Sequence, residues 1–358
     1  MANNNDKKVL NVPALRFPEF ADKWEKGYFK DVCKITTGNK NTQDKDENGL
    51  YPFYVRSQNI ERINSWTFDG EAILTAGDGV GVGKVFHYSI GKIGVHQRVY
   101  ILSNFKCDGK YLYQYFSSRF YNRVKRMSAK NSVDSVRMEM IADMPLYLPS
   151  VGEQHKIGKL LALLDERIST QNKIIEKLQS LIKGIAQNIV LRNKPNVRIS
   201  QCLECISSTL QESDVLEYGA YPVYGANGVV GFLDNYNTSN EAIYIIKDGS
   251  GVGAVSYVAG KCSATGTLNI LQAKKGFSLR YLYYLLNIFN FEPYKTGMAI
   301  PHIYFKDYGK AQIFCPSYSE QLKYAKFLAT IDDKLLTEQN VLINLSLQKQ
   351  YLLRQMFI

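Results

Sequence analysis

The longest regular pattern of apolar and polar positions runs over residues 151–192. Apolar residues recur there at steps of three and four, which is the heptad seam of a helix that packs lengthwise against another helix. Gln171 interrupts this seam, and a second such pattern over residues 318–358 is interrupted by Glu338 and Lys349. The predicted positions of the helix-pair seam are Leu161, Leu164, Ile168, Gln171, Ile175, Leu178, Ile182, Leu328, Ile331, Leu335, Glu338, Leu342 and Leu345.

The second helix is a copy of the first. Positions 161 and 328, 164 and 331, 171 and 338, and 189 and 356 all differ by 167. At 1.5 Å per residue, a helix of about 40 residues spans about 60 Å. A chain that leaves one globular part, runs that length, builds a second part and returns is expected to form an antiparallel helix pair with a domain at each end.

Gln171 and Glu338 lie near the midpoints of these helices and are expected to face each other to within a turn. We hypothesise that this polar pair sets the register of the two helices at some cost in stability, as buried polar seam residues can. The alternative is that both side chains point to solvent at a frayed part of the seam.

Short alternating segments separated by glycine-containing turns precede the first long helix. They predict strands at 51–55, 71–75, 84–89 and 98–102, and a helix at 110–127. The prolines of the segment 145–149 are expected to break the chain before the long helix. Residues 1–22, with their asparagines and prolines, are expected to form a loose N-terminal segment.

The second globular part repeats the first. The motif at 51–54 matches 221–224, the motif at 71–73 matches 241–243, and the glycine-rich run at 78–83 matches 248–253, all at an offset of 170. The sequence therefore predicts an α+β fold, with two tandem-repeated globular domains separated by an antiparallel pair of long coiled-coil helices in a pseudo-two-fold arrangement. The expected segments are a first domain at 1–150, a central helix at 151–195, a second domain at 196–317 and a distal helix at 318–358.

The net charge of +11 favours an anionic partner, but charge alone does not single out nucleic acid. Residues 1–150 carry 22 basic against 16 acidic groups, whereas residues 196–317 carry nine of each. No apolar run approaches the roughly 20 residues of a membrane span, and the first residues lack an apolar signal core. We therefore expect a cytoplasmic protein with no membrane partner, whose six cysteines are reduced.

The sequence contains no recognisable catalytic constellation. The run 79–84 invites comparison with a phosphate-binding loop, but Val85 stands where that loop needs Ser or Thr, and the repeat has Ala254 in place of the lysine. Its glycines are better explained by a tight strand connection or by a close approach to a nucleic-acid phosphate. Cys202 and Cys205 lack the further ligands of a zinc site. A binding or organising subunit without its own cofactor or metal is the preferred interpretation.

These motifs carry a family resemblance. Each long helix opens with Pro-Ser-x-x-Glu-Gln, at 149–154 and 316–321, and continues with Leu-Asp-Glu-Arg-Ile or Ile-Asp-Asp-Lys-Leu. The run Pro-x-Leu-Arg-Phe-Pro-Glu-Phe at 13–20 is similar to the opening of many members of the same family. In these features the whole chain resembles the DNA specificity subunit of type I restriction–modification systems.

The resemblance implies a division of labour between subunits. Each globular part would be a target recognition domain for one half of a split, asymmetric double-stranded DNA site, and the helix pair would space the halves. Two methyltransferase subunits, which bind S-adenosylmethionine and methylate adenine, would dock on this chain, and restriction subunits that use ATP and magnesium would join them. The chain itself would be a non-catalytic subunit of a host-defence complex.

The resemblance also places DNA recognition on loops of both domains, where Arg and Lys suit guanine and Asn and Gln suit adenine. The second domain, with its balanced charge, must depend more on amides, hydroxyls and tyrosines. The DNA-binding candidates of the first domain are Arg56, Ser57, Gln58, Asn59, Lys84, His96, Gln97, Arg98, Lys130, Asn131, Ser132 and Arg137. Those of the second are Asn227, Lys247, Ser250, Thr265, Thr267, His302, Tyr304 and Lys306.

Two other functions fit the same sequence less well. A stand-alone coiled-coil DNA-binding or scaffold protein would bind DNA specifically without a methyltransferase subunit. A DNA-modifying enzyme of an unrecognised kind would methylate or cleave DNA by itself.

Overall fold

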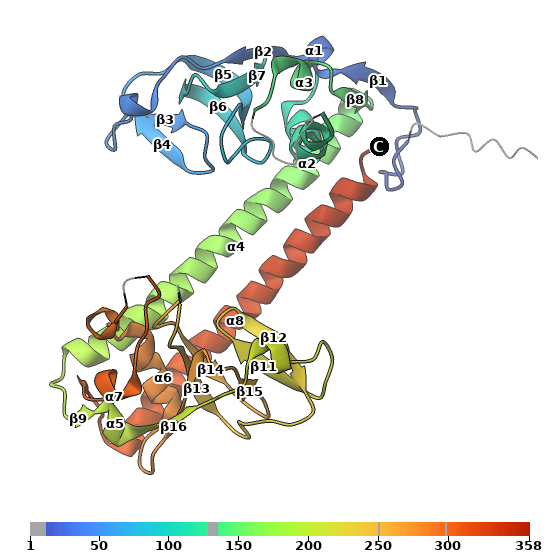
Figure 1. The fold of residues 1–358 in the computed structure, drawn as a ribbon. Coiled ribbons are helices and arrows are strands. Elements are labelled where there is room, and N and C mark those ends of the chain that lie inside the picture. Colours follow the sequence, from blue (N-terminus) through green and yellow to red (C-terminus); the bar gives the residue numbers. More distant parts are fainter. Residues whose placement is uncertain (1–11, 128–134, 250, 298) are drawn as a thin grey trace, which may run out of the picture. The chain divides into compact units, whose positions relative to one another are not determined.

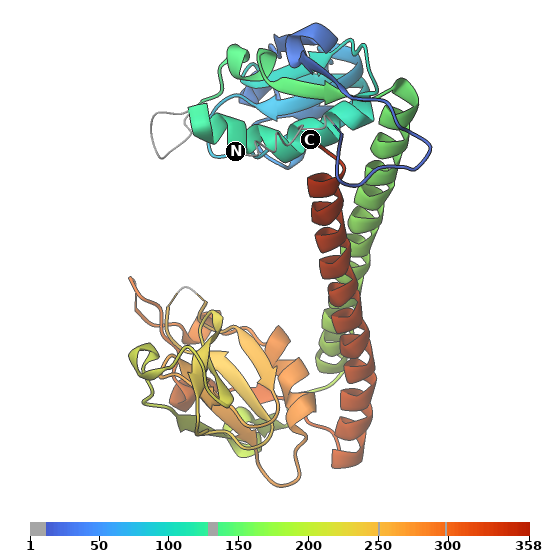
Figure 2. The same ribbon diagram turned by 90° about the vertical axis from the view of Figure 1, so that its right-hand side faces the viewer.

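The computed structural model describes residues 12–127, 135–249, 251–297 and 299–358. Contacts divide the chain into two compact units (Figure 1). Unit 1 comprises Met1–Thr170 and Leu342–Ile358, and unit 2 comprises Gln171–Val341. The long helices α4 (Val151–Leu191) and α8 (Tyr318–Gln355) are continuous, so each contributes one part to each unit (Figure 2).

The main sheet of unit 1 has six strands in the order β2-β7-β5-β6-β3-β4. Helix α2 covers one face, where Tyr111, Phe116 and Phe120 pack with Ile73 and Leu102. The elements of the globular part are β1 (Glu25–Tyr28), α1 (Phe29–Val32), β2 (Lys34–Thr37), η1 (Thr42–Asp44), β3 (Tyr51–Tyr54), β4 (Ile60–Ile63), β5 (Phe68–Ala76), β6 (Phe86–Val95), β7 (Val99–Ser103), α2 (Gly109–Met127), α3 (Met138–Ala142) and β8 (Pro145–Leu148).

Unit 2 has a similar plan divided into smaller sheets, with orders β10-β16-β13-β14, β12-β11-β15 and β17-β9. Helix α6 packs on the first of these, where Tyr281 and Leu282 join Ile243 and Leu271 in one core. The elements are β9 (Val197–Arg198), α5 (Ile199–Cys202), β10 (Leu203–Ser207), η2 (Glu212–Asp214), β11 (Tyr221–Gly225), β12 (Gly228–Leu233), β13 (Ala242–Ile246), β14 (Val255–Val258), β15 (Ser263–Ala264), β16 (Leu268–Ala273), α6 (Leu279–Ile288), η3 (Glu292–Tyr294), α7 (Phe305–Tyr308) and β17 (Gln312–Ile313).

One expectation about unit 1 is confirmed with an addition, and one needs correction. The segment 145–149 does break the chain before α4, but most of it is strand β8, which pairs with β1. Proline is tolerated there because Pro145 begins the strand and Pro149 lies beyond its end. Residues 1–11 of the N-terminal segment lie outside the described residues. Residues 12–22 are irregular but not loose, because the N–H of Leu15 donates to the carbonyl of Gln355 at 2.9 Å and Arg16 forms two hydrogen bonds with Glu153.

The sequence repeat is also a repeat of hydrogen bonds at the root of each long helix. The Gln154 carboxamide accepts from the N–H of Asp108 at 3.0 Å and donates to the carbonyl of Pro149 at 2.8 Å. Gln321, at the equivalent position, accepts from the N–H of Ser278 at 2.9 Å and likewise donates to the preceding proline carbonyl at 2.9 Å. Asp108 and Ser278 in turn cap α2 and α6. Gln154 thereby joins the start of α4 to α2 in unit 1, and Gln321 joins the start of α8 to α6 in unit 2.

The seam residues lie where the two long helices meet within each unit. Leu161 and Leu328 are fully buried, Ile175, Leu335 and Leu345 nearly so, and the remaining seam positions are buried or half-buried. Gln171 is only 7% exposed, and its amide donates to the carbonyl oxygen of Glu338 at 3.0 Å and to the Glu338 carboxylate. The solvent-facing alternative for this pair is therefore wrong.

The other polar interruption lies in unit 1. Lys349 pairs with the carboxylate of Asp165, which also accepts from the Gln114 amide on α2 at 2.6 Å. Asp165, the earlier of the two α4 residues, pairs with Lys349, the later of the two α8 residues. Gln171, further along α4, pairs with Glu338, further back on α8. The two helices therefore run antiparallel.

Candidate nucleic-acid interface

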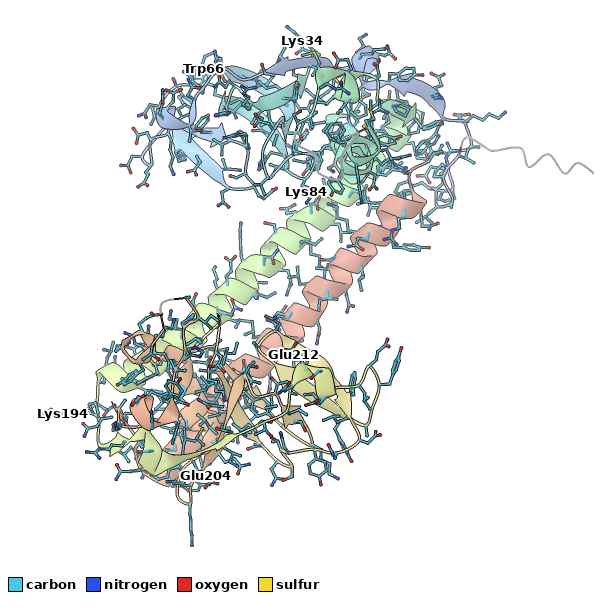
Figure 3. The ribbon with its side chains drawn as sticks, in the orientation of Figure 1. Lys34, Trp66, Lys84, Lys194, Glu204 and Glu212 are labelled. Atoms are coloured by element: carbon cyan, nitrogen blue, oxygen red, sulfur yellow. The ribbon has the colours of Figure 1, made fainter. Side chains whose placement is uncertain are left out.

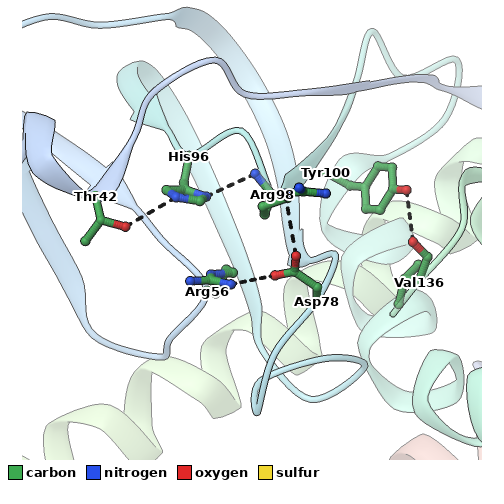
Figure 4. Close-up of polar contacts among 7 residues, drawn as sticks. All are labelled: Thr42, Arg56, Asp78, His96, Arg98, Tyr100 and Val136. Carbon is green, nitrogen blue, oxygen red and sulfur yellow. Dashed lines mark hydrogen bonds and ion pairs between the residues drawn. The ribbon is translucent and has the colours of Figure 1, made fainter. Parts of the chain in front are cut away.

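In unit 1, five side chains from three loops gather at the ends of β3, β5 and β7, and we call this group site 1: Arg56, Asp78, His96, Gln97 and Arg98. Figure 4 shows four of them, Arg56, Asp78, His96 and Arg98. Asp78 lies between the two arginines. One carboxylate oxygen is 2.8 Å from Nη1 of Arg56, and the other is 3.6 Å from Nε of Arg98. The arginine side chains remain 45% and 65% exposed, so both guanidinium groups are held and still accessible.

The backbone of the β6–β7 turn explains this arrangement. The N–H of His96 donates to the carbonyl of Tyr54 on β3 at 3.0 Å, and the N–H of Gly77 donates to the carbonyl of Arg98 at 2.8 Å. The first bond continues the parallel pairing of β3 with β6 beyond Val95, and the second continues the pairing of β5 with β7 beyond Ala76 and Val99. The turn that carries Gln97 and Arg98 is therefore fixed against the end of the sheet.

His96 lies beneath the exposed side chains of site 1 and is itself only 5% exposed. Its Nδ1 accepts from the backbone N–H of Arg98 at 3.0 Å, so in the neutral ring the proton is on Nε2, which lies 3.3 Å from the hydroxyl of Thr42. Burial lowers the pKa of His96, and the positive charge of Arg56 lowers it further. The neutral ring is the form that holds the Arg98 backbone.

A surface hollow of about 390 Å³ adjoins these side chains and is lined by donors and acceptors from Asn41, Thr42, Gln43, Arg56, His96, Gln97 and Arg98. A neighbouring hollow of about 170 Å³ is shared with Tyr100 and Val136. The Tyr100 hydroxyl donates to the carbonyl of Val136 at 3.0 Å, and the N–H of Val136 donates to that of Gly77 at 2.7 Å. The chain that enters α3 is thus joined to site 1.

The remaining first-domain candidates surround site 1. Ser57, Gln58 and Asn59 are exposed on the bend between β3 and β4, and Arg137 is exposed at the start of α3. Lys84, labelled in Figure 3, is exposed with its ammonium 5.3 Å from the ring centre of Tyr121. Lys130, Asn131 and Ser132 lie outside the described residues.

The glycine-rich run before Lys84 forms a tight turn whose N–H groups bond within the turn. The N–H groups of Val82, Lys84 and Val85 donate to carbonyls of Gly79 or Gly81. A Cβ at Gly81 would lie 2.4 Å from the carbonyl oxygen of Arg56. The close approach that requires glycine here is to the protein's own backbone, which favours the tight connection over a phosphate cradle.

In unit 2, the residue that matches Asp78 is Asp248, which holds a histidine rather than arginines. Its carboxylate is 2.6 Å from Nδ1 of His302, whose ring stacks on Tyr304. The ammonium of Lys306 is 5.2 Å from the Tyr304 ring centre, and Lys247 is half-buried beside this group. This surface contains a stacked ring pair and lysines where unit 1 has guanidinium groups.

The other second-domain candidates are less uniform. Asn227 is exposed at the tip of the β11–β12 hairpin. Thr265 is only 1% exposed, and its hydroxyl is 2.8 Å from that of the half-buried Thr267, so Thr265 lies beneath the surface rather than on it. Ser250 lies outside the described residues.

Sequence reasoning missed the acidic centre of site 1 and the amides of its hollow. Asp78 and Asp248 had a signal, since both open the repeated glycine-rich run. Asn41 and Gln43 had none, because the segment that carries them is brought to site 1 by tertiary contacts, which include the bridge between Lys40 and His96 and the contact of the Thr42 hydroxyl with His96. Among the described residues no group of three or more His, Cys, Asp or Glu side chains could hold a metal ion. No helix within the described ranges is long and apolar enough to cross a membrane.

Comparison with known proteins gives a consistent result. The specificity subunit of the type I restriction enzyme EcoDI from Escherichia coli is 25% identical over 167 residues, which cover 47% of this chain and 37% of that subunit. A putative type I specificity subunit from Mycoplasma genitalium is 22% identical over 282 residues, covering 72% of this chain and 73% of the relative.

The fold has a solved counterpart as well. The crystal structure of a type I restriction–modification S subunit from M. genitalium superposes with a TM-score of 0.73 at 18% identity, covering 97% of this chain and 99% of that one. The family model for the type I restriction modification DNA specificity domain matches twice, at residues 21–180 and 197–345. The chain therefore belongs to the family of type I restriction–modification DNA specificity proteins.

Proposed function

We propose that this chain is the specificity subunit of a type I restriction–modification complex, in which each unit recognises one half of a bipartite, asymmetric DNA site. The observation that carries the proposal is the double match to the DNA specificity domain, one copy on each of two units that share α4 and α8. Within each copy, polar and basic side chains gather around the acid that opens the glycine-rich run. The continuous helices would then set the distance between the two half-sites.

The DNA contacts are assigned to exposed loops. In unit 1 they comprise site 1, the bend at 56–59, Lys84 and the start of α3, where guanidinium and amide groups suit base edges and phosphates. In unit 2 they comprise the Asp248–His302 group with Tyr304, Lys306 and Lys247, and the hairpin tip at Asn227. Thr265 would act only by supporting Thr267 from below.

Catalysis is assigned to partner subunits. Two modification subunits would bind S-adenosylmethionine and transfer a methyl group to the N6 position of adenine, and restriction subunits would supply ATP- and magnesium-dependent cleavage. This chain would hold none of these cofactors and would act in the cytoplasm.

The test is to co-express the chain with a type I modification subunit, purify the complex and map methylated adenines in the host DNA. The proposal expects co-purification and a methylated motif of two short halves separated by a fixed gap. A contiguous motif, or no motif when the partner is present, would count against it. Tight sequence-specific DNA binding by the chain alone would favour the stand-alone DNA-binding protein instead.

A further inference from the structure

We propose that Arg98 and Arg56 form a guanine-reading pair in unit 1, with Asp78 as the positioning residue that aims both guanidinium groups. This inference rests on the proposed function, because it assigns a base to one of the half-sites. It names the chemical group that site 1 recognises: the O6 and N7 acceptors on the major-groove edge of guanine.

The hydrogen-bonding edges support this assignment. Recognition of guanine needs two parallel N–H donors on one guanidinium group. Arg98 points its Nε at Asp78, which leaves its two terminal nitrogens free, and Arg56 uses only Nη1, which leaves its Nε and Nη2 edge free. Among the described residues no other side-chain acceptor engages either group. Each arginine therefore keeps one two-donor edge.

The two groups are also constrained before any ligand binds. An exposed arginine normally loses rotamer freedom when it docks, and a fixed fork loses less. The carboxylate of Asp78 limits both side chains, while Gly77 and His96 hold the backbone of Arg98 from either side. An arginine that only neutralised a phosphate would not need this constraint, because a phosphate contact tolerates many directions.

Unit 2 provides an internal contrast. The matching acid, Asp248, engages the imidazole of His302, and no arginine stands in this group. The guanine prediction therefore applies to only one half of the DNA site. A substitution in site 1 should alter that half and leave the other half and the gap unchanged.

The experiment uses the assembled complex with its modification subunit and compares the methylated motifs of wild type, Arg98→Ala, Arg98→Lys, Arg56→Ala and Asp78→Asn. Arg98→Ala should relax one guanine position in one half-site, with discrimination falling by about 10- to 100-fold. Arg56→Ala should relax a guanine in the same half. Asp78→Asn should relax these positions less, because it removes the constraint and keeps the readers.

Arg98→Lys separates base reading from charge. Lysine keeps the charge and can donate to guanine, but it lacks the planar two-donor edge, so it should restore the guanine preference only in part; full restoration would overturn the inference. The matched control is Asp248→Asn, which should affect only the other half-site. If wild type yields no bipartite motif, the proposed function fails. If wild type yields one and Arg98→Ala weakens methylation evenly at all sites, or leaves the motif unchanged in a normally folded complex, only the guanine assignment fails.

Discussion

The amide nitrogen of Gln171 lies 3.0 Å from the backbone carbonyl oxygen of Glu338 and also donates to its carboxylate, so the polar residues that interrupt the two seams meet each other. Replacing both with Leu should remove buried polar groups from an apolar seam. We expect a gain of about 1–2 kcal/mol in local stability, together with looser register. Amide hydrogen exchange in the middle of α4 would measure the stability.

Register can be measured in the same variant. Positions 178 and 331 lie seven residues from the polar pair on the two antiparallel helices, so cysteines there should crosslink in the native register. The double Leu variant should crosslink less efficiently. Unchanged crosslinking together with unchanged exchange would remove any role of the pair in setting register.

Arg16 and Glu153 form a bidentate ion pair whose carboxylate is fully buried. Arg16→Ala should destabilise unit 1 by about 3 kcal/mol, because it leaves a buried charge without its partner. The repeat supplies a control in Glu320, which matches Glu153. Glu320 is exposed, and its carboxylate accepts a hydrogen bond from the Ser317 hydroxyl at the start of α8. Glu320→Gln should cost about 1 kcal/mol or less. Hydrogen exchange resolved by unit would distinguish the two, and equal effects would contradict this account.

Stability of unit 1 should depend on pH through His96. Its pKa lies below the ordinary value of 6.5, so as pH falls below that value the unfolded chain takes up a proton that the folded ring resists. The stabilisation is therefore complete above about pH 6.5 and declines toward acid, by at most about 1.4 kcal/mol per pH unit for this group.

His96→Asn gives the matched variant, because its side-chain oxygen can accept the N–H of Arg98 without titrating. Exchange rates of the β6–β7 turn between pH 7.5 and 5.5, corrected for intrinsic exchange, should lose part of their pH dependence in this variant. The remaining dependence should include His87, whose pKa is also lowered by burial. An unchanged pH profile would show that His96 does not titrate in this range.

Phe357 packs edge-on against the rings of both Tyr111 and Tyr115, with both ring centroids 5.4 Å away, and is 3% exposed. Phe357→Ala should destabilise unit 1 by about 3–5 kcal/mol through loss of burial and a cavity. Tyr351→Ala, on an exposed position of α8, should change stability by less than about 0.5 kcal/mol. If Phe357→Ala speeds amide hydrogen exchange more in unit 2 than in unit 1, the assignment of Phe357 to the core of unit 1 is wrong.

Helix length offers a test of the spacer role. Insertion of one helical turn into both α4 and α8 at the unit boundaries, after Thr170 and after Val341, adds about 5.4 Å to each. At about 3.4 Å per base pair, the gap in the methylated motif should lengthen by one to two base pairs, while both half-sites stay the same. An insertion that changes a half-site and leaves the gap unaltered would argue against a spacer.

Long periodic elements were predictable, and contacts between short ones were not. The strands at β3, β5 and β7 and the helix α2 followed from alternation and from aromatic residues three or four positions apart. Strand β6 begins at Phe86, later than predicted, because Lys84 belongs to the glycine-rich turn over Tyr121. Strand β1 has the sequence Glu-Lys-Gly-Tyr, which carries no alternation of apolar and polar residues, so its pairing with β8 appeared only in three dimensions.

Site 1 illustrates the same limit. Arg56 and Arg98 could be selected from residue type and loop position. Asp78 opens the repeated glycine-rich run, but its role as their common partner was not predictable, since it lies 22 and 20 positions from them in the sequence. Only the strand register that places Ala76 opposite Val99 brings Asp78 to the β6–β7 turn. In unit 2, Thr265 had the right residue type, but it packs inward beside β16, and sequence gave no indication of its direction.

The division of the chain into units bears on the order in which it folds during synthesis. Unit 2 is one continuous stretch, Gln171–Val341, so all its contacts are present once that stretch has left the ribosome. Unit 1 needs Leu342–Ile358 as well, including Met356 and Phe357 in its core. The part translated first is therefore completed last. Until then the core of unit 1 lacks the apolar side chains that Met356 and Phe357 supply.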